Sequence, residues 1–494
     1  MRTLSPILRN LLLHPGREII VDDQRRWKGF HLLLGSLHLA RVIERTTERP
    51  HVGVMLPTSG LFPMAMIAGW VLGRTVVPLN YLLKKEDLAY VIGDAELDAV
   101  VTVSKMLEMF GELPEGVKAI KLDEAAREFK GLPRPRWPKR VPEDFLALLL
   151  YTSGTSGKPK GVMLTDGNLS ANVAQIRGWV DFTPKDVLLG VLPQFHTFAL
   201  TVLTLLPLSA GCKVVYTARF APKKLLDLME EHRPTVFVAI PSMYAALLGA
   251  KSATPEHWKS FRYVVSGGEP LPEAVFNGYR ERFNVTLNEG YGLTETAPVT
   301  NWCRPEDHPR NRKSVGMALP RVEEKIVSPE GRRLGVNEEG EICIKGPNVM
   351  KGYYKLPEET KAVFDDEGFF RTGDMGKIDE DGHLYITGRI KEMLIIGGEN
   401  VFPREIEEVL NKHPSVAASA VIGMMDESRG EVPVAFVELK EGAEFNETEL
   451  RSHCRKDLAQ YKVPRDIRVM EKLPRNPTGK ILRRELKAEA AKAD

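Results

Sequence analysis

Cysteine is scarce in this chain of 494 residues, which holds only Cys212, Cys303, Cys343 and Cys454. The four lie far apart and form no CxxC pair, so their spacing argues against a structural zinc site and against a disulfide framework. Unpaired thiols persist in a reducing compartment. The cysteine content therefore favours a cytoplasmic location.

An excess of charge of one sign is absent as well. The 68 Lys and Arg residues nearly balance the 66 Asp and Glu residues, so the chain lacks the general positive field of a nucleic-acid-binding protein. Long apolar runs are also missing, since no segment approaches the roughly 20 apolar residues that span a bilayer. We therefore expect no nucleic-acid partner and no integral membrane segment, while peripheral contact with a membrane stays open.

The N-terminal stretch MRTLSPILRNLLLHPG lacks the long hydrophobic region and the small-residue cleavage site of a secretory signal. We expect it to form an amphipathic helix that packs on the body of the protein. The overall composition, 43% hydrophobic and 27% charged, is that of an ordinary globular protein. A chain of this length exceeds the size at which a single core stops growing, so at least two domains are expected.

Short β-rich runs alternate with helical periods between residues 211 and 287. CKVVYT, TVFVAI, RYVVS and NVTL are typical of strands, and KKLLDLMEEH and SMYAALLGA of helices. A further helix carries Leu271, Val275, Tyr279 and Phe283 on one face. This alternation predicts βα units that feed a mostly parallel sheet.

Three polar, glycine-containing segments come shortly after apolar runs of this kind. They are Ser153 to Gly161, Ser266 to Glu269 and Tyr291 to Glu295. Ligands of open α/β sheets bind outside the carboxyl ends of the strands. We therefore expect all three segments to lie on one rim of the sheet.

The first polar segment belongs to the run YTSGTSGKPKG, which combines hydroxyls, glycines and two lysines between apolar strands. Glycines let backbone amides turn toward an anion, hydroxyls donate hydrogen bonds and lysines supply charge, a combination that suits a polyphosphate. It is not a Walker A loop, because Lys158 is followed by Pro159 rather than by Ser or Thr. A flexible surface loop is the alternative, which the flanking strands and the lysines disfavour.

Five motifs occur in order along the chain, namely YTSGTSGKPKG, YGLTET, FRTGD, GRIKEMLIIGGENVFPREIE and PRNPTGKILRREL. Together they resemble the motif set of the adenylate-forming superfamily, which contains acyl-coenzyme A ligases, firefly luciferase and the adenylation domains of peptide synthetases. The resemblance covers nearly the whole chain from about Val52 onward. A single motif would be a weak signal, whereas five in family order are specific.

The resemblance implies an α/β fold with two domains. Residues 1–388 would form a large N-terminal domain of mostly parallel β-sheets with helices and a β-subdomain. Residues 389–494 would form a small, mobile C-terminal α+β domain that carries a catalytic lysine. The composition of this last region, with its own strands and helices, is sufficient for a small domain.

The resemblance also implies an enzyme that joins a carboxylic acid to AMP with release of pyrophosphate and then passes the acyl group to a thiol. Its cosubstrates would be ATP with Mg²⁺ and coenzyme A. The nucleotide-binding residues carried over from the family motifs are Thr152, Ser153, Gly154, Thr155, Ser156, Gly157, Lys158, Lys160, Gly267, Gly268, Glu269, Tyr291, Gly292, Thr294, Asp374 and Arg389. Asp374 and Arg389 would lie at the ribose, and Gly267, Gly268, Glu269 and Tyr291 would frame the adenine.

The first half-reaction brings a carboxylate against an already anionic triphosphate, so the like charges must be screened. By resemblance, Glu295 would coordinate Mg²⁺ with help from the hydroxyl of Thr155, and Thr294 would contact the α-phosphate. Lys480, in PTGK, would join the carboxylate to the α-phosphate in the transition state. Taken singly, Glu295 and Lys480 are also compatible with a role as ordinary charged side chains in solvent. Asp374 is likewise compatible with a role as a turn residue.

The second half-reaction requires a different face of the small domain. The family rotates this domain about a hinge, and Lys391 matches the hinge position. Gly397, Gly398 and Glu399 would then line the channel of the attacking thiol. Because relatives often carry Tyr or Arg in place of Glu399 or Asn400, two thiol acceptors stay open, coenzyme A and the phosphopantetheine of an acyl carrier protein.

The acid substrate is expected to be hydrophobic. The region between residues 168 and 302 is more similar to bacterial long-chain fatty acid ligases than to peptide-synthetase domains, and Phe198, Met243 and Val299 are candidate walls for an apolar chain. A fatty acid is the leading substrate, and an aryl acid is the alternative. His196 matches a position at the edge of the acyl pocket. The sequence is equally compatible with a catalytic role for this residue and with a structural role as a packed core histidine.

Overall fold

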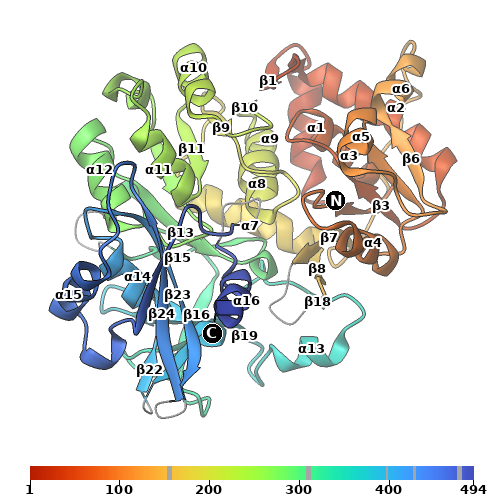
Figure 1. The fold of residues 1–494 in the computed structure, drawn as a ribbon. Coiled ribbons are helices and arrows are strands. Elements are labelled where there is room, and N and C mark those ends of the chain that lie inside the picture. Colours follow the sequence, from red (N-terminus) through yellow and green to blue (C-terminus); the bar gives the residue numbers. More distant parts are fainter. Residues whose placement is uncertain (153–157, 308–312, 397–398, 427–429, 476–480, 494) are drawn as a thin grey trace.

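The computed structural model describes residues 1–152, 158–307, 313–396, 399–426, 430–475 and 481–493. The fold is α/β, with a large N-terminal part built on sheets and a small C-terminal domain, as the sequence predicted. Figure 1 shows the two parts, with the C-terminal elements at the lower end of the molecule.

A nine-stranded sheet forms one half of the large part. Its strands, in spatial order, are β15 (Met317–Ala318), β14 (Val299–Trp302), β13 (Asn288–Gly292), β12 (Tyr263–Ser266), β11 (Val236–Ala239), β9 (Val187–Gly190), β10 (Lys213–Tyr216), β1 (Glu18–Val21) and β2 (Arg26–Lys28). The strands from β13 to β1 pair in parallel, while β2, β14 and β15 add antiparallel edges. Runs of Val, Leu and Phe in the centre are typical of strands covered on both faces.

A seven-stranded sheet forms the other half. Its strands are β18 (Gly352–Tyr353), β8 (Lys160–Thr165), β7 (Leu146–Thr152), β4 (Thr75–Pro78), β3 (His51–Val54), β5 (Ala99–Thr102) and β6 (Lys118–Lys121). The prediction that the three polar segments share one rim of a single sheet is therefore wrong. β7 and β8 flank the first segment in this sheet, whereas β12 and β13 carry the other two in the nine-stranded sheet. Local periodicity predicts strands but does not show which sheet a strand joins.

The main core lies between these two sheets and is filled by helices. They are α1 (Leu4–Leu13), α2 (Gly29–Thr46), α3 (Leu61–Val71), α7 (Asp166–Trp179) and the continuous α8 (Thr197–Leu200), η2 (Thr201–Leu205) and α9 (Leu206–Ala210). One hydrophobic cluster includes Val52 of the smaller sheet, Leu188 of the larger sheet and Leu203 of η2. The amphipathic helix predicted at the N-terminus is present, with Leu4, Ile7 and Leu11 buried in this cluster.

The large part contains further helices and 3₁₀ turns. They are α4 (Lys85–Asp94), α5 (Ser104–Phe110), α6 (Leu122–Ala125), η1 (Ala126–Glu128), α10 (Pro222–His232), α11 (Pro241–Gly249), η3 (Pro255–Trp258), α12 (Glu273–Phe283), η4 (Thr294–Thr296), η5 (Pro305–Asp307) and α13 (Pro357–Ala362). The predicted apolar face of α12 is buried, but the strand predicted at NVTL begins only at Asn288 and extends through Tyr291. Strand pairing with β12 and β14 decides this register.

A four-stranded antiparallel sheet leads to the C-terminal domain. It consists of β16 (Glu323–Val327), β17 (Gly340–Lys345), β19 (Phe370–Ile378) and β20 (Leu384–Arg389). β19 and β20 form a hairpin around Asp379, whose Oδ1 accepts hydrogen bonds from the N–H groups of Asp381 and His383. This hairpin places Asp374 opposite Arg389.

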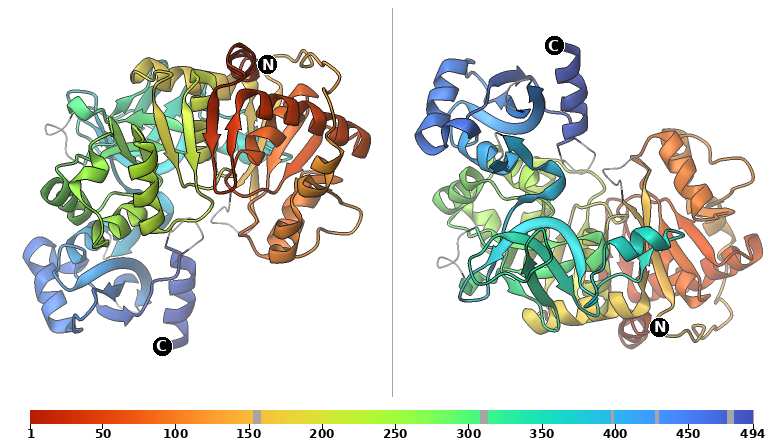
Figure 2. Two further views of the ribbon diagram at one scale, coloured as in Figure 1. Left: turned by 90° about the horizontal axis from the view of Figure 1, so that it is seen from above. Right: turned by 90° about the horizontal axis from the view of Figure 1, so that it is seen from below.

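The C-terminal domain has its own sheet and cores. Its elements are η6 (Ile390–Glu392), β21 (Leu394–Ile396), β22 (Glu399–Val401), α14 (Pro403–Leu410), β23 (Val416–Asp426), β24 (Gly430–Leu439), α15 (Glu447–Asp457), η7 (Gln460–Lys462), β25 (Asp466–Met470) and α16 (Arg483–Ala493). β20 ends at Arg389 and the new sheet begins at Leu394, while the domain boundary after residue 388 stays a prediction. Figure 2 shows the domain projecting from the large part.

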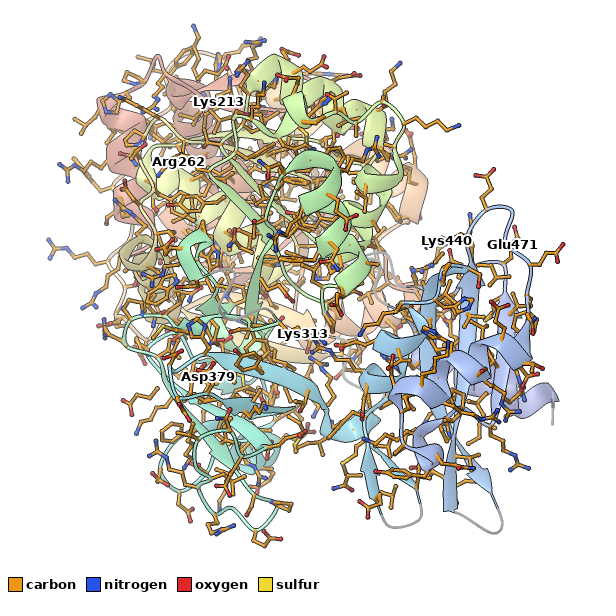
Figure 3. All side chains as sticks on the ribbon, turned by 90° about the vertical axis from the view of Figure 1, so that its left-hand side faces the viewer. Lys213, Arg262, Lys313, Asp379, Lys440 and Glu471 are labelled. Carbon is orange, nitrogen blue, oxygen red and sulfur yellow. The ribbon has the colours of Figure 1, made fainter. Side chains whose placement is uncertain are left out.

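Ion pairs link the large part to the C-terminal domain on their facing surfaces. Lys313 Nζ lies 3.2 Å from Glu408 Oε2, and Lys412 Nζ lies 3.4 Å from Glu273 Oε2. Figure 3 shows Lys313 at the junction between the two parts.

All four cysteines are buried and free. Within the described ranges, no helix has both the length and the apolar character that crossing a membrane requires.

Candidate active site

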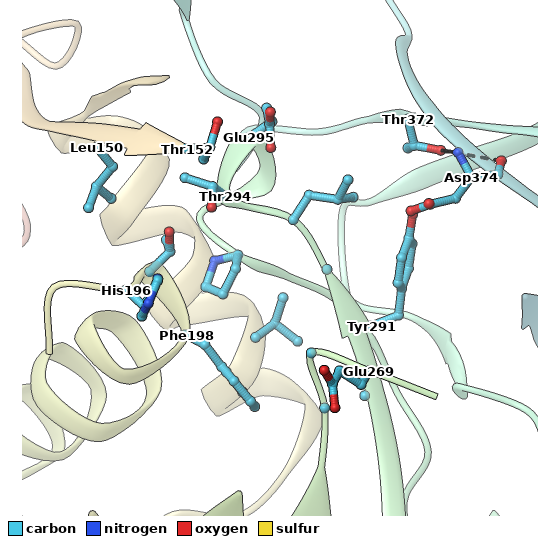
Figure 4. Close-up of a pocket in the computed structure, with 18 of the residues that line it drawn as sticks. Leu150, Thr152, His196, Phe198, Glu269, Tyr291, Thr294, Glu295, Thr372 and Asp374 are labelled. Atoms are coloured by element: carbon cyan, nitrogen blue, oxygen red, sulfur yellow. Dashed lines mark hydrogen bonds between the residues drawn. The ribbon is translucent and has the colours of Figure 1, made fainter. Parts of the chain in front are cut away.

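A cavity of about 820 Å³ opens where the two large sheets, the four-stranded sheet and the start of the C-terminal domain meet. Figure 4 shows part of its lining. The predicted site residues that line it are Thr152, Lys160, His196, Gly267, Gly268, Glu269, Tyr291, Gly292, Thr294, Glu295, Asp374, Arg389 and Lys391. Residues separated by more than 200 positions in the sequence thus share one cavity.

The other predicted residues fall into two groups. Lys158 and Glu399 are described and exposed, and neither lines the cavity. Eight residues lie outside the described ranges, namely Ser153, Gly154, Thr155, Ser156, Gly157, Gly397, Gly398 and Lys480. The roles of all these residues stay predictions.

Asp374 is the centre of a polar cluster at one end of the cavity. It is buried in β19, and its carboxylate accepts a hydrogen bond from the Tyr291 hydroxyl at 2.6 Å. The Nε of Arg389 lies 2.8 Å from the other carboxylate oxygen. Burial, followed by the Asp374 charge, raises the pKa of Tyr291 well above its ordinary value, so the phenol stays protonated as a donor. The cluster holds an anionic acceptor rigidly, as a pair of sugar hydroxyls would require.

Glu295 occupies the middle of the cavity, at the 3₁₀ turn η4. Its Oε1 accepts a hydrogen bond from the Tyr353 hydroxyl at 3.0 Å. Burial raises the pKa of the Glu295 carboxyl, and the Tyr353 hydrogen bond opposes that shift. Among the described residues no cation forms an ion pair with Glu295, so a divalent cation would relieve the cost of burying this charge.

These surroundings fit a Mg²⁺ ion that is shared with a nucleotide. The described residues contain no group of three or more His, Cys, Asp or Glu side chains able to hold a metal by themselves. Mg²⁺ commonly uses one or two carboxylates and completes its shell with substrate phosphates and water. One buried carboxylate beside the hydroxyl-bearing Thr152 and Thr294 meets that need (Figure 4).

The two lysines of the first motif point in different directions. Lys160 lines the cavity, forms an ion pair with Glu359, and lies 5.3 Å from the ring centroid of Tyr353. Lys158 lies over the ring of Tyr90, 4.9 Å from its centroid, on the surface. Lys160 is therefore the lysine of this motif that already lies at the cavity.

Close backbone approach explains the two glycines after β12. A Cβ added to Gly267 would lie 3.0 Å from the ring of Phe198 and 3.3 Å from the carbonyl oxygen of Gly290. Gly268 has φ +84°, in the region that favours glycine. A flat group that enters beside β12 and β13 therefore meets the backbone of Gly267 and Gly268, because these two positions carry no side chain.

The other end of the cavity is apolar. Phe198, Met243 and Val299, which the sequence indicated as walls, all line it. Further lining comes from Ile176, Val202, Val238, Ile240, Val265 and Trp302. No Lys or Arg side chain is among these residues.

His196 lies at the N-terminus of α8, between the polar and apolar ends of the cavity (Figure 4). Its Nε2 is buried and has no hydrogen-bond partner among the residues that the structure describes. Burial lowers the pKa of His196 to about 4, so the ring is neutral at neutral pH. A neutral imidazole offers a substrate carboxylate a hydrogen bond but no charge.

Several cavity residues escaped the sequence interpretation. Tyr353 holds Glu295 from 58 positions away, and Thr372 donates its hydroxyl to the backbone of Ile342 and accepts from the N–H of Asp374. Arg371 pairs with buried Glu341 at the same rim. No local pattern indicates the Tyr353 contact, whereas Thr372 lies within the FRTGD motif.

The chain matches known enzymes over most of its length. The family described as AMP-binding enzyme matches residues 9–354, and the AMP-binding enzyme C-terminal domain matches residues 405–480. The chain is 34% identical over 459 residues to 4-coumarate-CoA ligase 1 of Narcissus pseudonarcissus, covering 89% of this chain and 84% of that protein. It is 40% identical over 357 residues to a long-chain-fatty-acid–CoA ligase of Bacillus subtilis, covering 71% of this chain and 63% of that protein.

A solved structure shows the same fold over the full length. ATP-bound MatB from Rhodopseudomonas palustris superposes with a TM-score of 0.89 at 32% identity, and 98% of each chain is covered. The shared fold therefore includes the C-terminal domain as well as the large sheets. From these matches over most of its length, the chain belongs to the AMP-binding enzyme family.

Proposed function

We propose that the chain activates a hydrophobic monocarboxylic acid, in the first place a fatty acid, and transfers its acyl group to coenzyme A. The chain is an AMP-forming acid–thiol ligase, and its cosubstrates are ATP with Mg²⁺ and coenzyme A. The four free, buried cysteines support a cytoplasmic location. The choice of a hydrophobic acid rests on the apolar end of the cavity.

The apolar end selects against a second charge on the substrate. Phe198, Met243 and Val299 would surround the body of the acid, and among the described residues that line this end of the cavity there is no Lys or Arg. Burying an unpaired carboxylate there would cost several kcal/mol, on the order of the desolvation penalty of a single ion. A dicarboxylic acid is therefore a poor substrate, and an acid with one carboxylate and an apolar body is a good one.

The polar end accounts for activation of the carboxylate. Glu295 would hold Mg²⁺, which screens the phosphate charges that otherwise repel the attacking acid. We assign Lys480 to the developing charge between carboxylate and α-phosphate, with Thr294 and Lys160 beside the phosphates. Asp374 would accept hydrogen bonds from the ribose, and the backbone at Gly267 and Gly268 would border the adenine.

The second half-reaction would use a rotated small domain. We assign residues 1–388 to the nucleotide- and acid-binding domain and residues 389–494 to the moving domain. Lys391 would lie at the hinge, and Gly397, Gly398 and Glu399 would line the thiol channel. Rotation removes Lys480 from the cavity and lets the thiol reach the acyl-AMP carbonyl.

A second candidate acid is a phenylpropenoic acid. The relative that supports it is covered over 84% of its length, more than the 63% of the fatty acid ligase. An aromatic ring is flat and apolar, so the same walls would accept it. A carrier-protein thiol remains the alternative acceptor.

One assay distinguishes these possibilities. Pyrophosphate release would be measured with saturated fatty acids of increasing length, 4-coumarate and malonate, each with and without coenzyme A or a phosphopantetheinylated carrier protein. We expect the highest kcat/KM with a saturated acid and thioester formation only with coenzyme A. Faster turnover of 4-coumarate would favour the aryl acid, and preference for malonate would refute the apolar-pocket argument.

A further inference from the structure

A basic loop lies outside the cavity and has no part in the proposed reaction. It spans residues 127–140, REFKGLPRPRWPKR, and includes one acidic residue, Glu128. Its cations are Arg127, Lys130, Arg134, Arg136, Lys139 and Arg140. In a chain whose net charge is only +2, this loop is a local concentration of positive charge.

Two large apolar side chains project from the basic loop into solvent. Leu132 is 85% exposed and Trp137 is 89% exposed. Of the six tryptophans in the chain, the other five are buried or partly buried. Isolated exposed apolar residues need no explanation, but a tryptophan and a leucine five positions apart among six cations form an unusual surface.

Contacts with the large domain anchor the basic loop, from which Leu132 and Trp137 project outward. The Phe129 ring stacks on His38 with centroids 5.0 Å apart, and the N–H of Lys139 donates to the carbonyl of Val71. Arg136 makes two hydrogen bonds to the carboxylate of Glu44 on α2, at 2.9 and 2.6 Å. Anchors at both ends and in the middle hold the loop against the large domain.

A surface depression of about 630 Å³ borders Trp137. Its cationic lining consists of Arg49, Arg74, Arg136 and Lys139, and Glu44 and Glu48 supply the opposite charge. Glu44 is already paired with Arg136. The depression therefore presents a net positive surface next to an apolar side chain.

We propose that the basic loop binds the surface of an anionic phospholipid bilayer. Trp137 and Leu132 would enter the interface, where amphipathic rings are favoured, while the cations attract lipid phosphates. A nucleic acid or an acidic protein would use the charge but leave Leu132 without a partner. The ion pair of Arg2 with Glu143 places the end of the loop beside the N-terminus, which lies far from the C-terminus in both views of Figure 2. Bilayer binding thus leaves the small domain free to move.

The fluorescence of Trp137 depends on its environment and therefore reports whether this side chain enters a bilayer. Full-length protein would be titrated with phosphatidylcholine vesicles containing 30% phosphatidylglycerol or none, and tryptophan emission and acrylamide quenching would be followed. We expect a shift to shorter wavelength and reduced quenching with the anionic vesicles only, and no shift in Trp137→Phe. An unchanged spectrum, or an equal shift with neutral vesicles, would overturn the proposal.

Sedimentation with the same vesicles tests which residues of the basic loop contribute to vesicle binding. Arg134→Glu/Lys139→Glu should weaken binding about tenfold or more, because each cation near the surface contributes about a fivefold factor. Leu132→Ser/Trp137→Ser should also release the protein, and binding of the wild type should weaken in high salt. All variants should keep the wild-type melting temperature and activity on a short, soluble acid.

The loop at residues 331–336 offers a matched control. It contains exposed Arg332 and Arg333, and Val336 is 56% exposed. Arg332→Glu/Arg333→Glu and Val336→Ser should bind vesicles as the wild type does. Equal losses in control and test variants would indicate general charge attraction and refute a specific surface. Tighter binding to duplex DNA or polyglutamate than to the vesicles would assign the loop to another partner and refute it as well.

Discussion

Glu295 illustrates how single side chains adjust the chemistry of the cavity. Burial makes its carboxylate harder to ionise, and the Tyr353 hydroxyl at 3.0 Å stabilises the charged form. In our proposal Glu295 holds Mg²⁺ and must be ionised to do so, and the hydrogen bond would then extend the pH range in which Glu295 can act. We therefore propose that Tyr353 is a positioning residue.

We predict that Tyr353→Phe moves the acidic limb of acid-dependent ATP–pyrophosphate exchange to higher pH by about one unit, the order expected from one hydrogen bond to a charge. The raised folded pKa means that activity falls as pH decreases, and loss of the donor raises that pKa further. Exchange rates between pH 5.5 and 9 measure the shift. Tyr354→Phe removes a hydroxyl that donates to Glu96 at the surface and should leave the profile unchanged. A uniform loss at all pH values would contradict the assignment.

Lys480 is the residue on which the adenylation step depends most in our proposal. Lys480→Ala should lower acyl-AMP formation about 10²- to 10³-fold, by analogy with the loss of one oxyanion donor. Turnover of supplied acyl-AMP with coenzyme A should persist. Single-turnover assays of each half-reaction measure both effects, with exposed Lys472→Ala as the control. Equal loss in the two half-reactions would remove Lys480 from this role.

At the scale of elements, the connection between β20 and β21 links the four-stranded sheet to the sheet of the C-terminal domain. It consists of the short 3₁₀ turn η6, Ile390–Glu392, and Met393. Lys391 is exposed there and also lines the cavity. Because a hinge absorbs a large change in φ and ψ within a few residues, a short turn between two sheets is suited to that role.

We predict that Lys391→Pro spares adenylation and lowers thioester formation at least tenfold, because proline restricts φ to about −65°. Pyrophosphate exchange and acyl-CoA formation, measured separately, give the two rates. Lys391→Ala removes the side chain but keeps the backbone free, so both rates should stay within about threefold of the wild type. Normal thioester formation in the proline variant would place the hinge elsewhere.

At the scale of the whole molecule, ion pairs on the facing surfaces link the two domains in the orientation observed. Lys412 with Glu273 and Lys313 with Glu408 are partly exposed pairs. Each such pair contributes about 0.2–1 kcal/mol. That is small against the stability of either domain, but it is enough to change the balance between two orientations.

We predict that Lys412→Glu changes the ratio of adenylation rate to thioester rate by about two- to fivefold, as one surface pair allows. The charge swap Lys412→Glu/Glu273→Lys should restore the ratio, and high salt should reduce the difference between variants. Rapid-quench measurement of the two rates supplies the ratio. Failure of the swap to restore it would show that the pair does not influence the orientation.

The sequence alone determined the local features of this protein, namely the helix period of α12, the strands at CKVVYT, TVFVAI and RYVVS, and the composition of the polar, glycine-containing segments. Such features depend on neighbours within a few positions, and so does the resemblance that identified the family. The tertiary structure alone decided that the polar segments lie in two sheets around one cavity, that Tyr291 meets Asp374 across 83 positions, and that Tyr353 holds Glu295. Long-range pairing depends on which apolar faces of the entire chain are buried together, and no local period encodes that choice.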